Sequence, residues 1–541
     1  MLNRKLPTVD ASRFSMVPRA DVPRSTFHTM HTHKTTFHSG YLVPIYVDEV
    51  LPGDVHKGDV TVFGRLATPL FPIMDNMKLE TFFFFVPSRL VWDNWKKMMG
   101  EQANPGDSIA YTVPQCVSPS NGFAVCSIGD YFGLPTVGML VSAGTVSVNA
   151  MPLRAYNLIW NEWFRDENLN NSVVVSKGDG PDASTQYALL RRNKRHDYFT
   201  SCLPWPLKGG TTISLPLGGF AAVNPIIPGV STFQLQGGNH PPMTPRADAT
   251  TVGQTLVNAM WLEGSGDNEP NTSLHWLTSG LQADLSTATG ATINAMRLAV
   301  ATQQLLEKDA RGGTRYTELL KQHFGVTPED ARLQRPEYIG GGQTDIQTSA
   351  VPQTSAQIAA GTPLGTLGAA GIMNGQHRFS YHATEHGYII GLIHCGADLT
   401  YQQGLHKMWT RKTRYDFYWP TFAHLGEQVV KQGELYVIGD ANDDNVFGYQ
   451  ERWAEYRHRP GRITGMFKSP SAGAIDQWHL AQRFLAAPLL NPTFIQDNPP
   501  VDRVIAAGQT ADNMQILFDS VFKIASTRPL PTFSVPGLDR F

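Results

Sequence analysis

Four histidines lie within eleven positions near the start of the chain, in the stretch RSTFHTMHTHKTTFHSG at residues 24–40. Histidine is a common zinc ligand, and its charge changes close to neutral pH. On a β-strand, alternation puts His31 and His33 on one face and His28 and His38 on the other. A His-x-His pair supplies two zinc ligands, but the sequence indicates no third one. We therefore favour a polar strand or arm at a subunit boundary over a metal site, with pH-sensitive assembly as one consequence.

Two other stretches carry the letters of metal-binding motifs. HATEH at residues 382–386 matches the HxxEH pattern of one zinc-hydrolase class, which needs both histidines on one helix. Its flanks are strand-like, and on a strand His382 and His386 would lie about 13 Å apart. DANDDNVFGYQE at 440–451 imitates an EF-hand calcium loop, but the preceding ELYVIG is strand-like where the entering helix should be. Only weak metal candidates remain, all in this last loop: Asp440, Asn442, Asp444 and Glu451.

Basic and aromatic residues alternate in WTRKTRYDFYW at 409–419 and in ERWAEYRHRPGR at 451–462. Aromatic rings stack on unpaired bases and cations contact phosphates, so such stretches are typical of single-stranded nucleic-acid surfaces. Alternatively, the tryptophans belong to a core or interface and the arginines form ion pairs between subunits, which the spacing alone favours. No residue is predicted to be catalytic. The candidate nucleic-acid-facing residues are Arg411, Lys412, Arg414, Arg452, Arg457 and Arg459.

The elements that must position these residues are mainly β-strands, rich in β-branched and aromatic residues. We expect strands within 41–51, 60–71, 79–90, 377–401, 413–426 and 434–440. Helical spacing is confined to 90–99, 152–168, 291–310 and 315–324. The Gly- and Ala-rich residues 340–376 predict an extended loop. Strands at both ends with long insertions between them predict a mainly β fold with a few helices, one β-sandwich or jelly roll whose loops outweigh its sheets.

The composition changes along the chain and indicates its organisation. Residues 1–40 form an extended basic arm, either a solvated tail or an arm on a neighbouring subunit or nucleic acid. A single jelly-roll domain is expected over 41–208 and 290–500. Residues 209–289, dense in Gly, Pro, Thr and Asn, predict a surface insertion with short strands of its own. Residues 501–541 predict an extended, Pro-rich C-terminal tail.

The overall composition excludes several classes of protein. A net charge of −2 argues against a globally basic nucleic-acid binder, and a charged content of 17% suits a chain that buries much surface against partners. Four cysteines without a CxxC pair form neither a disulfide framework nor a zinc knuckle, and they suit a reducing cytoplasm. A signal peptide and an apolar run of membrane-spanning length are both absent, so no membrane insertion is expected.

Several longer blocks resemble, together and in order, the major capsid proteins of gokushoviruses, a branch of the microviruses. These viruses are small icosahedral bacteriophages with single-stranded DNA. The resemblance covers nearly the whole chain except 209–289. The blocks are SRFSMVP (12–18), LVPIYVDEVLPGD (42–54), WNEWFRDENL (160–169), DARLQRPEYIGGG (330–342), HGYIIGLIHCGADLTYQQGL (386–405), TRYDFYWPTFAHLGEQ (413–428), FGYQERWAEYRHRPGRITG (447–465) and WHLAQRF (478–484).

The resemblance implies a viral jelly roll of eight strands that self-assembles in the bacterial cytoplasm into a T=1 shell around circular single-stranded DNA. The insertion between Gly209 and Thr289 would form a surface protrusion that contacts a host receptor. Implied partners are an internal scaffolding protein, a small basic DNA-binding protein and a DNA-pilot protein, and neither a cofactor nor a catalytic residue is implied. Two alternatives stay open on the residues alone: a metal-dependent hydrolase using HATEH or the His-x-His pair, and a carbohydrate-binding β-sandwich.

Overall fold

The computed structural model describes residues 23–141, 143–209, 293–355, 364–506 and 514–533, together with six strands between residues 222 and 284. The chain divides into two compact units. The first comprises Met1–Pro206 and Asp309–Phe541, and the second comprises Leu207–Lys308. The first unit contains the main sheet and all the candidate site residues except the insertion.

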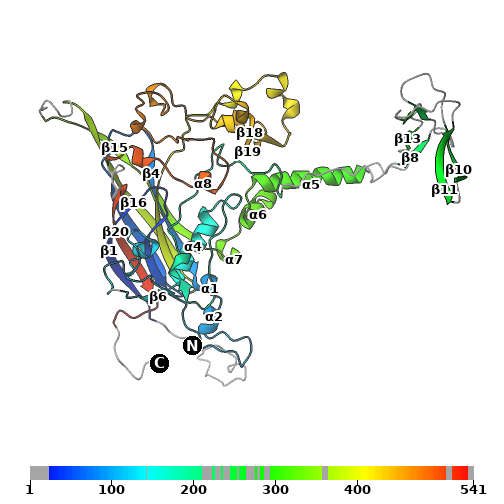
Figure 1. Cartoon of the computed structure of the whole chain (residues 1–541). Helices are drawn as coiled ribbons and strands as arrows, with labels where there is room; N and C mark the ends of the chain where they lie inside the picture. Colours follow the sequence, from blue (N-terminus) through cyan, green and yellow to red (C-terminus); the bar gives the residue numbers. More distant parts are fainter. Residues whose placement is uncertain are drawn as a thin grey trace, which may run out of the picture. The chain divides into compact units, whose positions relative to one another are not determined.

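The first unit is organised around a nine-stranded antiparallel sheet (Figure 1). Its strands are β1 (Ser25–Phe37), β2 (Val43–Val50), β3 (Val55–Leu66), β4 (Met77–Pro87), β14 (Glu337–Asp345), β15 (Gln347–Pro352), β16 (Leu367–His382), β17 (Gly387–Ala397) and β20 (Ile516–Arg528). The order is β1-β20-β3-β16-β14-β4-β17-β2, with β15 paired to β16. If β15 is left out and the other eight strands are renumbered 1 to 8 in chain order, the order across the sheet is 1-8-3-6-5-4-7-2. It divides into two four-stranded halves, 1-8-3-6 and 5-4-7-2. This order is that of a jelly roll, so the predicted fold is confirmed.

The sheet curls until its two edge strands face each other. The ring of His31 on β1 stacks 5.9 Å from that of Tyr46 on β2. Nearby, Arg528 Nη2 at the end of β20 lies 3.1 Å from Asp48 Oδ2 on β2. These contacts nearly close the sheet and protect edges that would otherwise expose unpaired backbone groups.

The run of four phenylalanines in β4 is explained by burial on both faces of this strand. Phe83 and Phe85 point into the core inside the curled sheet, beside Phe379 and Phe522. Phe84 points outward into a second core that helices cover. A strand covered on both sides needs apolar residues at successive positions, in contrast to the alternating pattern of a strand with one solvated face.

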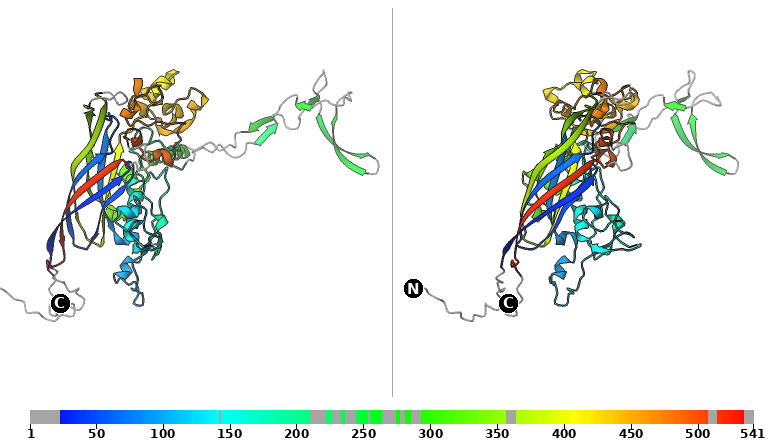
Figure 2. Two further views of the ribbon diagram at one scale, coloured as in Figure 1. Left: turned by 60° about the vertical axis from the view of Figure 1, so that its left-hand side comes forward. Right: turned by 90° about the vertical axis from the view of Figure 1, so that its left-hand side faces the viewer.

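Both chain ends differ from the sequence-based expectation of extended arms. Residues 25–37 of the expected N-terminal arm form β1, and residues 516–528 of the expected C-terminal tail form β20. The two strands pair along their whole length, from Ser25 opposite Arg528 to Phe37 opposite Ile516, and lie side by side in Figure 2. β1 is mostly polar because much of it is exposed, and this polarity concealed its place in the sheet.

The Gly-rich stretch 340–376, expected to be a loop, contributes to β14 and β16, and that expectation is wrong. Glycine is needed here because neighbouring groups approach the backbone closely. A Cβ on Gly341 would lie 2.1 Å from the Thr81 carbonyl oxygen, and one on Gly342 would lie 2.3 Å from the His377 ring. The absence of side chains is therefore a packing requirement within the sheet.

The predicted helices are confirmed, although the first is split into α1 (Ser88–Val91) and α2 (Trp95–Met98). The helix α6 (Tyr316–Phe324) is capped by Gly325, whose φ of 71° is in the left-handed region. The strands expected at 413–426 and 434–440 are wrong. Two 3-10 turns, at Arg414–Asp416 and Pro420–Phe422, lie in the first stretch, and the second contains turns, bends and one isolated bridge at Tyr436. The other helices and small strands are α3 (Ile128–Tyr131), α4 (Met151–Ile159), α5 (Ile293–Arg311), α6 (Tyr316–Phe324), α7 (Asp330–Leu333), α8 (Pro492–Ile495), β5 (Gln115–Val117), β6 (Ser147–Asn149), β7 (Asp182–Ala183), β18 (Glu427–Lys431) and β19 (Val446–Glu451).

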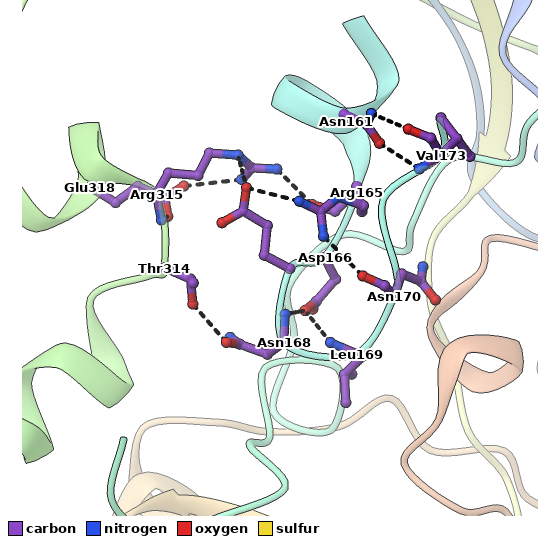
Figure 3. Close-up of polar contacts among 11 residues, drawn as sticks. Asn161, Arg165, Asp166, Asn168, Leu169, Asn170, Val173, Thr314, Arg315 and Glu318 are labelled. Atoms are coloured by element: carbon purple, nitrogen blue, oxygen red, sulfur yellow. Dashed lines mark hydrogen bonds and ion pairs between the residues drawn. The ribbon is translucent and has the colours of Figure 1, made fainter. Parts of the chain in front are cut away.

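Two long insertions interrupt the jelly roll, one between β4 and β14 and one between β17 and β20. Within the first, the loop after α4 binds the chain where it returns before α6 (Figure 3). Arg315 donates a hydrogen bond of 2.6 Å to the Arg165 carbonyl and shares Glu167 with the Arg165 guanidinium. Thr314 also bonds Asn168 at 2.6 Å. These contacts attach the two segments to each other.

The described residues of the second unit contain six strands, which pair as nested antiparallel partners. Proceeding inward, β8 (Ala222–Pro225) pairs with β13 (Leu281–Asp284), β9 (Phe233–Leu235) with β12 (Leu274–Trp276), and β10 (Thr244–Val252) with β11 (Thr255–Glu263). Such nesting is that of one long, interrupted hairpin. Most of the expected host-contact insertion, Gly209 to Thr289, otherwise lies outside the described residues.

Candidate nucleic-acid interface

The two basic-aromatic stretches come together on one surface in the β17–β20 insertion. Arg411 donates a 2.5 Å hydrogen bond to the Tyr456 hydroxyl, and the Tyr418 ring packs edge-on against Trp453 at 5.5 Å. Trp453 is buried, whereas Trp409 and Tyr415 are 69% and 61% exposed. An exposed aromatic surface of this kind marks an interaction site.

The cations on this surface are not equally available to a ligand. Arg411 pairs with Glu455 at 3.2 Å and Arg457 with Glu451 at 2.6 Å. Arg414 lies over Trp419, and Arg452 lies 4.3 Å from the centre of the Trp453 ring. The sequence alternative placed these arginines in ion pairs between subunits. Arg411 and Arg457 instead form their ion pairs within one chain. In the part of the chain that the structure describes, Lys412 and Arg459 form no ion pair.

A cavity of about 740 Å³ opens next to this surface. Its floor is part of a small third hydrophobic core, which supplies Tyr198, Phe199 and Tyr401. Sequence reasoning missed this floor because its residues are far apart along the chain. It also passed over Arg462, inside the quoted RHRPGR, and Lys468, which both line the cavity. Only the fold brings these residues together.

HATEH ends β16 at His382 and continues as the turn that leads to β17, so it forms neither a helix nor the continuous strand assumed for its spacing. Glu385 receives two hydrogen bonds from the Arg89 guanidinium, at 2.6 and 2.9 Å. The His386 ring packs against Trp95 at 5.5 Å. The residues of this motif therefore hold the turn against the helices that follow β4.

The calcium-like loop forms a 3-10 turn followed by β19. Asp440 accepts a 2.8 Å hydrogen bond from the Asn442 backbone N–H at the start of the turn. Asp444 pairs with Lys431 at 2.6 Å, and Glu451 pairs with Arg457. Each of these carboxylates already has a partner. Among the residues that the structure describes, no group of three or more His, Cys, Asp or Glu side chains is placed to hold a metal ion.

Comparison with known proteins decides what kind of protein carries this surface. Residues 15–538 match the family model described as "Capsid protein (F protein)". The chain belongs to this capsid protein family. The capsid chain is 45% identical to capsid protein VP1 of Bdellovibrio phage phiMH2K over 536 residues, which cover 97% of each chain. It is 41% identical to capsid protein VP1 of Chlamydia phage 1, with 99% of each chain covered, and 36% identical to capsid protein VP1 of Spiroplasma virus 4, with 97% covered.

The resemblance to the gokushovirus-type microvirus capsid proteins is thereby confirmed. The capsid chain is a structural component of a virion and not an enzyme, so the hydrolase alternative is wrong. Its four cysteines are free thiols. No helix among the described residues is long and apolar enough to cross a membrane.

Three of the four clustered histidines, His28, His31 and His33, lie on β1 of this capsid protein, whereas His38 follows the end of the strand. His31 points inward, with its ring stacked 4.9 Å from Phe522, and His33, two residues on, shares that face. Burial lowers the pKa of His33, and His31 lowers it further, against the opposing effects of Asp130 and Asp519. Burial also lowers the pKa values of His56 on β3 and His377 on β16.

We expect the capsid chain to lose stability as the pH falls from 7.5 to 5.5. A histidine with a lowered folded-state pKa binds a proton more readily when unfolded, so its stabilising contribution is lost as the pH falls below about 6.5. Urea unfolding at both pH values measures the change in the free energy of unfolding, and His33→Gln should reduce it. The exposed His28→Gln is the matched control and should not. Equal stability at both pH values would contradict the prediction.

Proposed function

We propose that copies of this capsid protein close into a T=1 icosahedral shell around a circular single-stranded DNA genome. The observation that carries the proposal is similarity to VP1 capsid proteins over 97–99% of both chains. The jelly roll supports it as well, because its long insertions offer surfaces on which copies can meet. A charged content of only 17% agrees with extensive burial between copies.

Assembly occurs in the bacterial cytoplasm with an internal scaffolding protein and a DNA-pilot protein. The net charge of −2 cannot balance DNA phosphates, so a small basic DNA-binding protein neutralises most of them. The capsid chain adds local contacts through its basic-aromatic surface, where Lys412 and Arg459 form no ion pair with the described residues and are candidates to contact phosphates. The insertion between Gly209 and Thr289 contacts the host receptor.

Electron microscopy of the purified protein tests the proposal, first alone and then with the rest of the viral genome expressed. Uniform closed particles with T=1 symmetry are expected in at least the second case, and nuclease-protected DNA should be single-stranded and circular. Deletion of residues 209–289 should leave particles that form but no longer adsorb to host cells. Small oligomers in both cases would contradict the shell, and particles of another symmetry would contradict T=1.

A further inference from the structure

We propose that the cavity in the β17–β20 insertion binds one unstacked nucleotide of single-stranded DNA, with the base inside and the phosphate at its rim. This inference rests on the proposed enclosure of single-stranded DNA. It narrows a general basic surface to a defined pocket, which retains Arg411 and Arg459 and adds Arg462 and Lys468. Three independent features of the cavity carry it: its size, its aromatic lining and its unpaired cations.

The size and floor of the cavity suit a planar, partly apolar ligand. About 740 Å³ lies within the range of small-molecule sites, roughly 300–1,000 Å³, and is ample for one nucleotide. Tyr198, Phe199 and Tyr401 on the floor are buried and fixed by the third hydrophobic core. A floor held in this way is already formed before a ligand enters, which reduces the entropy lost on binding.

Aromatic rings at the cavity offer stacking faces. The His458 ring lies parallel to Tyr198, 5.3 Å away with an angle of 7° between the planes. Tyr456 carries Arg411 on one face at 4.4 Å, and 52% of the tyrosine is exposed. Trp409 lines the same cavity and is largely exposed. Every base has a π-face, so such rings bind bases with little preference for sequence.

The charges around the cavity favour an anion. Its lining contains five cations, Lys407, Arg411, Arg459, Arg462 and Lys468, against two carboxylates, which gives an excess of three positive charges with histidines neutral (5 − 2 = 3). Both carboxylates are buried and engaged. Glu455 bonds Arg411 and Gln428, and Glu434 accepts a 3.0 Å hydrogen bond from the Tyr198 hydroxyl and lies 3.7 Å from Lys407.

The excess of positive charge lies on three exposed residues, Arg459, Arg462 and Lys468. None of them forms an ion pair within the described part of the chain. The unpaired cations match the phosphate of a nucleotide, and the aromatic cavity beside them matches its base. A neutral carbohydrate would use the rings and leave all three cations unmatched, and a basic peptide would be repelled.

The test measures binding of a fluorescently labelled ten-residue deoxythymidine strand to the full-length, unassembled protein by anisotropy. Arg462→Gln should weaken binding about 10-fold and reduce the slope of log K against log salt by about one, as loss of one phosphate contact requires. Arg332→Gln is the matched control, because Arg332 is 80% exposed on α7 and lies far along the chain from the cavity residues. The affinity of this variant for the strand should equal that of the wild-type protein. Equal affinities for Arg462→Gln and the control would overturn the phosphate site.

A second variant tests the base separately. Trp409→Ala should weaken binding of the thymidine strand about 10-fold, the effect of losing one stacked base. It should leave unchanged the affinity for an abasic strand of the same length, which keeps every phosphate. An equal loss for both strands would overturn base insertion, as would binding of a neutral oligosaccharide that depends on Trp409. Particle formation, followed by electron microscopy of the same variants, reports on the shell. Intact particles with unaltered strand binding would overturn the pocket alone, whereas absence of particles from the wild type would overturn the proposed function.

Discussion

Replacing Asp182 by alanine will lower the free energy of unfolding of this capsid protein by about 3–5 kcal/mol, because it leaves the Arg154 guanidinium buried without its counter-charge. Arg154 is fully buried and Asp182 is 4% exposed. Two parallel hydrogen bonds of 2.7 Å join them, and Arg154 also donates to the carbonyls of Val91 and Gly178. Burial raises the pKa of Asp182, but the hydrogen bonds from Arg154 and Tyr187 outweigh it and hold this pKa below its usual range.

The measurement is urea unfolding of the full chain at pH 7 and one protein concentration, with particle yield as a second readout. Glu329→Ala is the matched control, because its partner Arg332 lies at a similar distance but both side chains are highly exposed. It should change nothing measurable. The double variant Arg154→Met with Asp182→Leu should be more stable than Asp182→Ala, since it buries no unpaired charge. If Asp182→Ala unfolds like the control, the pair does not hold α4 and β7 together.

Phe83→Ala will cost about as much, roughly 3–5 kcal/mol, through the cavity it leaves inside the curled sheet. The Phe83 ring is fully buried and stacks 4.4 Å from Phe379. Its neighbour across the strands is Gly391, where a Cβ would lie 2.6 Å from that ring. Because Gly391 has no side chain, the residue of β17 directly opposite Phe83 cannot fill the vacated space.

Thermal and urea unfolding check this second prediction against two further variants. Phe83→Leu should lose less than the alanine variant, because it refills most of the volume. Phe63→Ala on β3 removes the same atoms from a ring that is 41% exposed, and its effect should remain below about 1 kcal/mol. A loss for Phe83→Ala as small as that for Phe63→Ala would show that the region inside the sheet is not the main core.

Local sequence patterns predicted those elements whose cause is local. The helix that ends at Gly325 was predictable because glycine takes the left-handed conformation without strain. The central strands were predictable because β-branched and aromatic residues gather there, and that His31 and His33 share one face of a strand followed from alternation alone. The jelly roll and the family also followed from the sequence, since long ordered blocks are far more specific than any short motif.

Other features depend on partners distant in the chain. Residues 25–37 were expected to form a polar strand or part of an extended arm because they are polar, and residues 516–528 were expected to be part of a tail. β1 is a strand because β20, about 480 to 500 residues away along the chain, supplies its hydrogen bonds, and β20 pairs on its other side with β3. The glycines of β14 and β16 resembled a loop until the close approach of Thr81 and His377 explained them.

The same distinction applies to the candidate site. The sequence by itself determined that arginines and aromatic residues gather at 409–419 and 451–462. Only the tertiary structure decided that Arg411 is bound to Glu455, and that Arg462 and Lys468 line an aromatic cavity with no carboxylate partner among the described residues. The type of a side chain is local, but whether its charge is satisfied depends on which distant carboxylates the fold brings within a few ångströms of it, because Coulomb energy falls with distance and solvent screens it further.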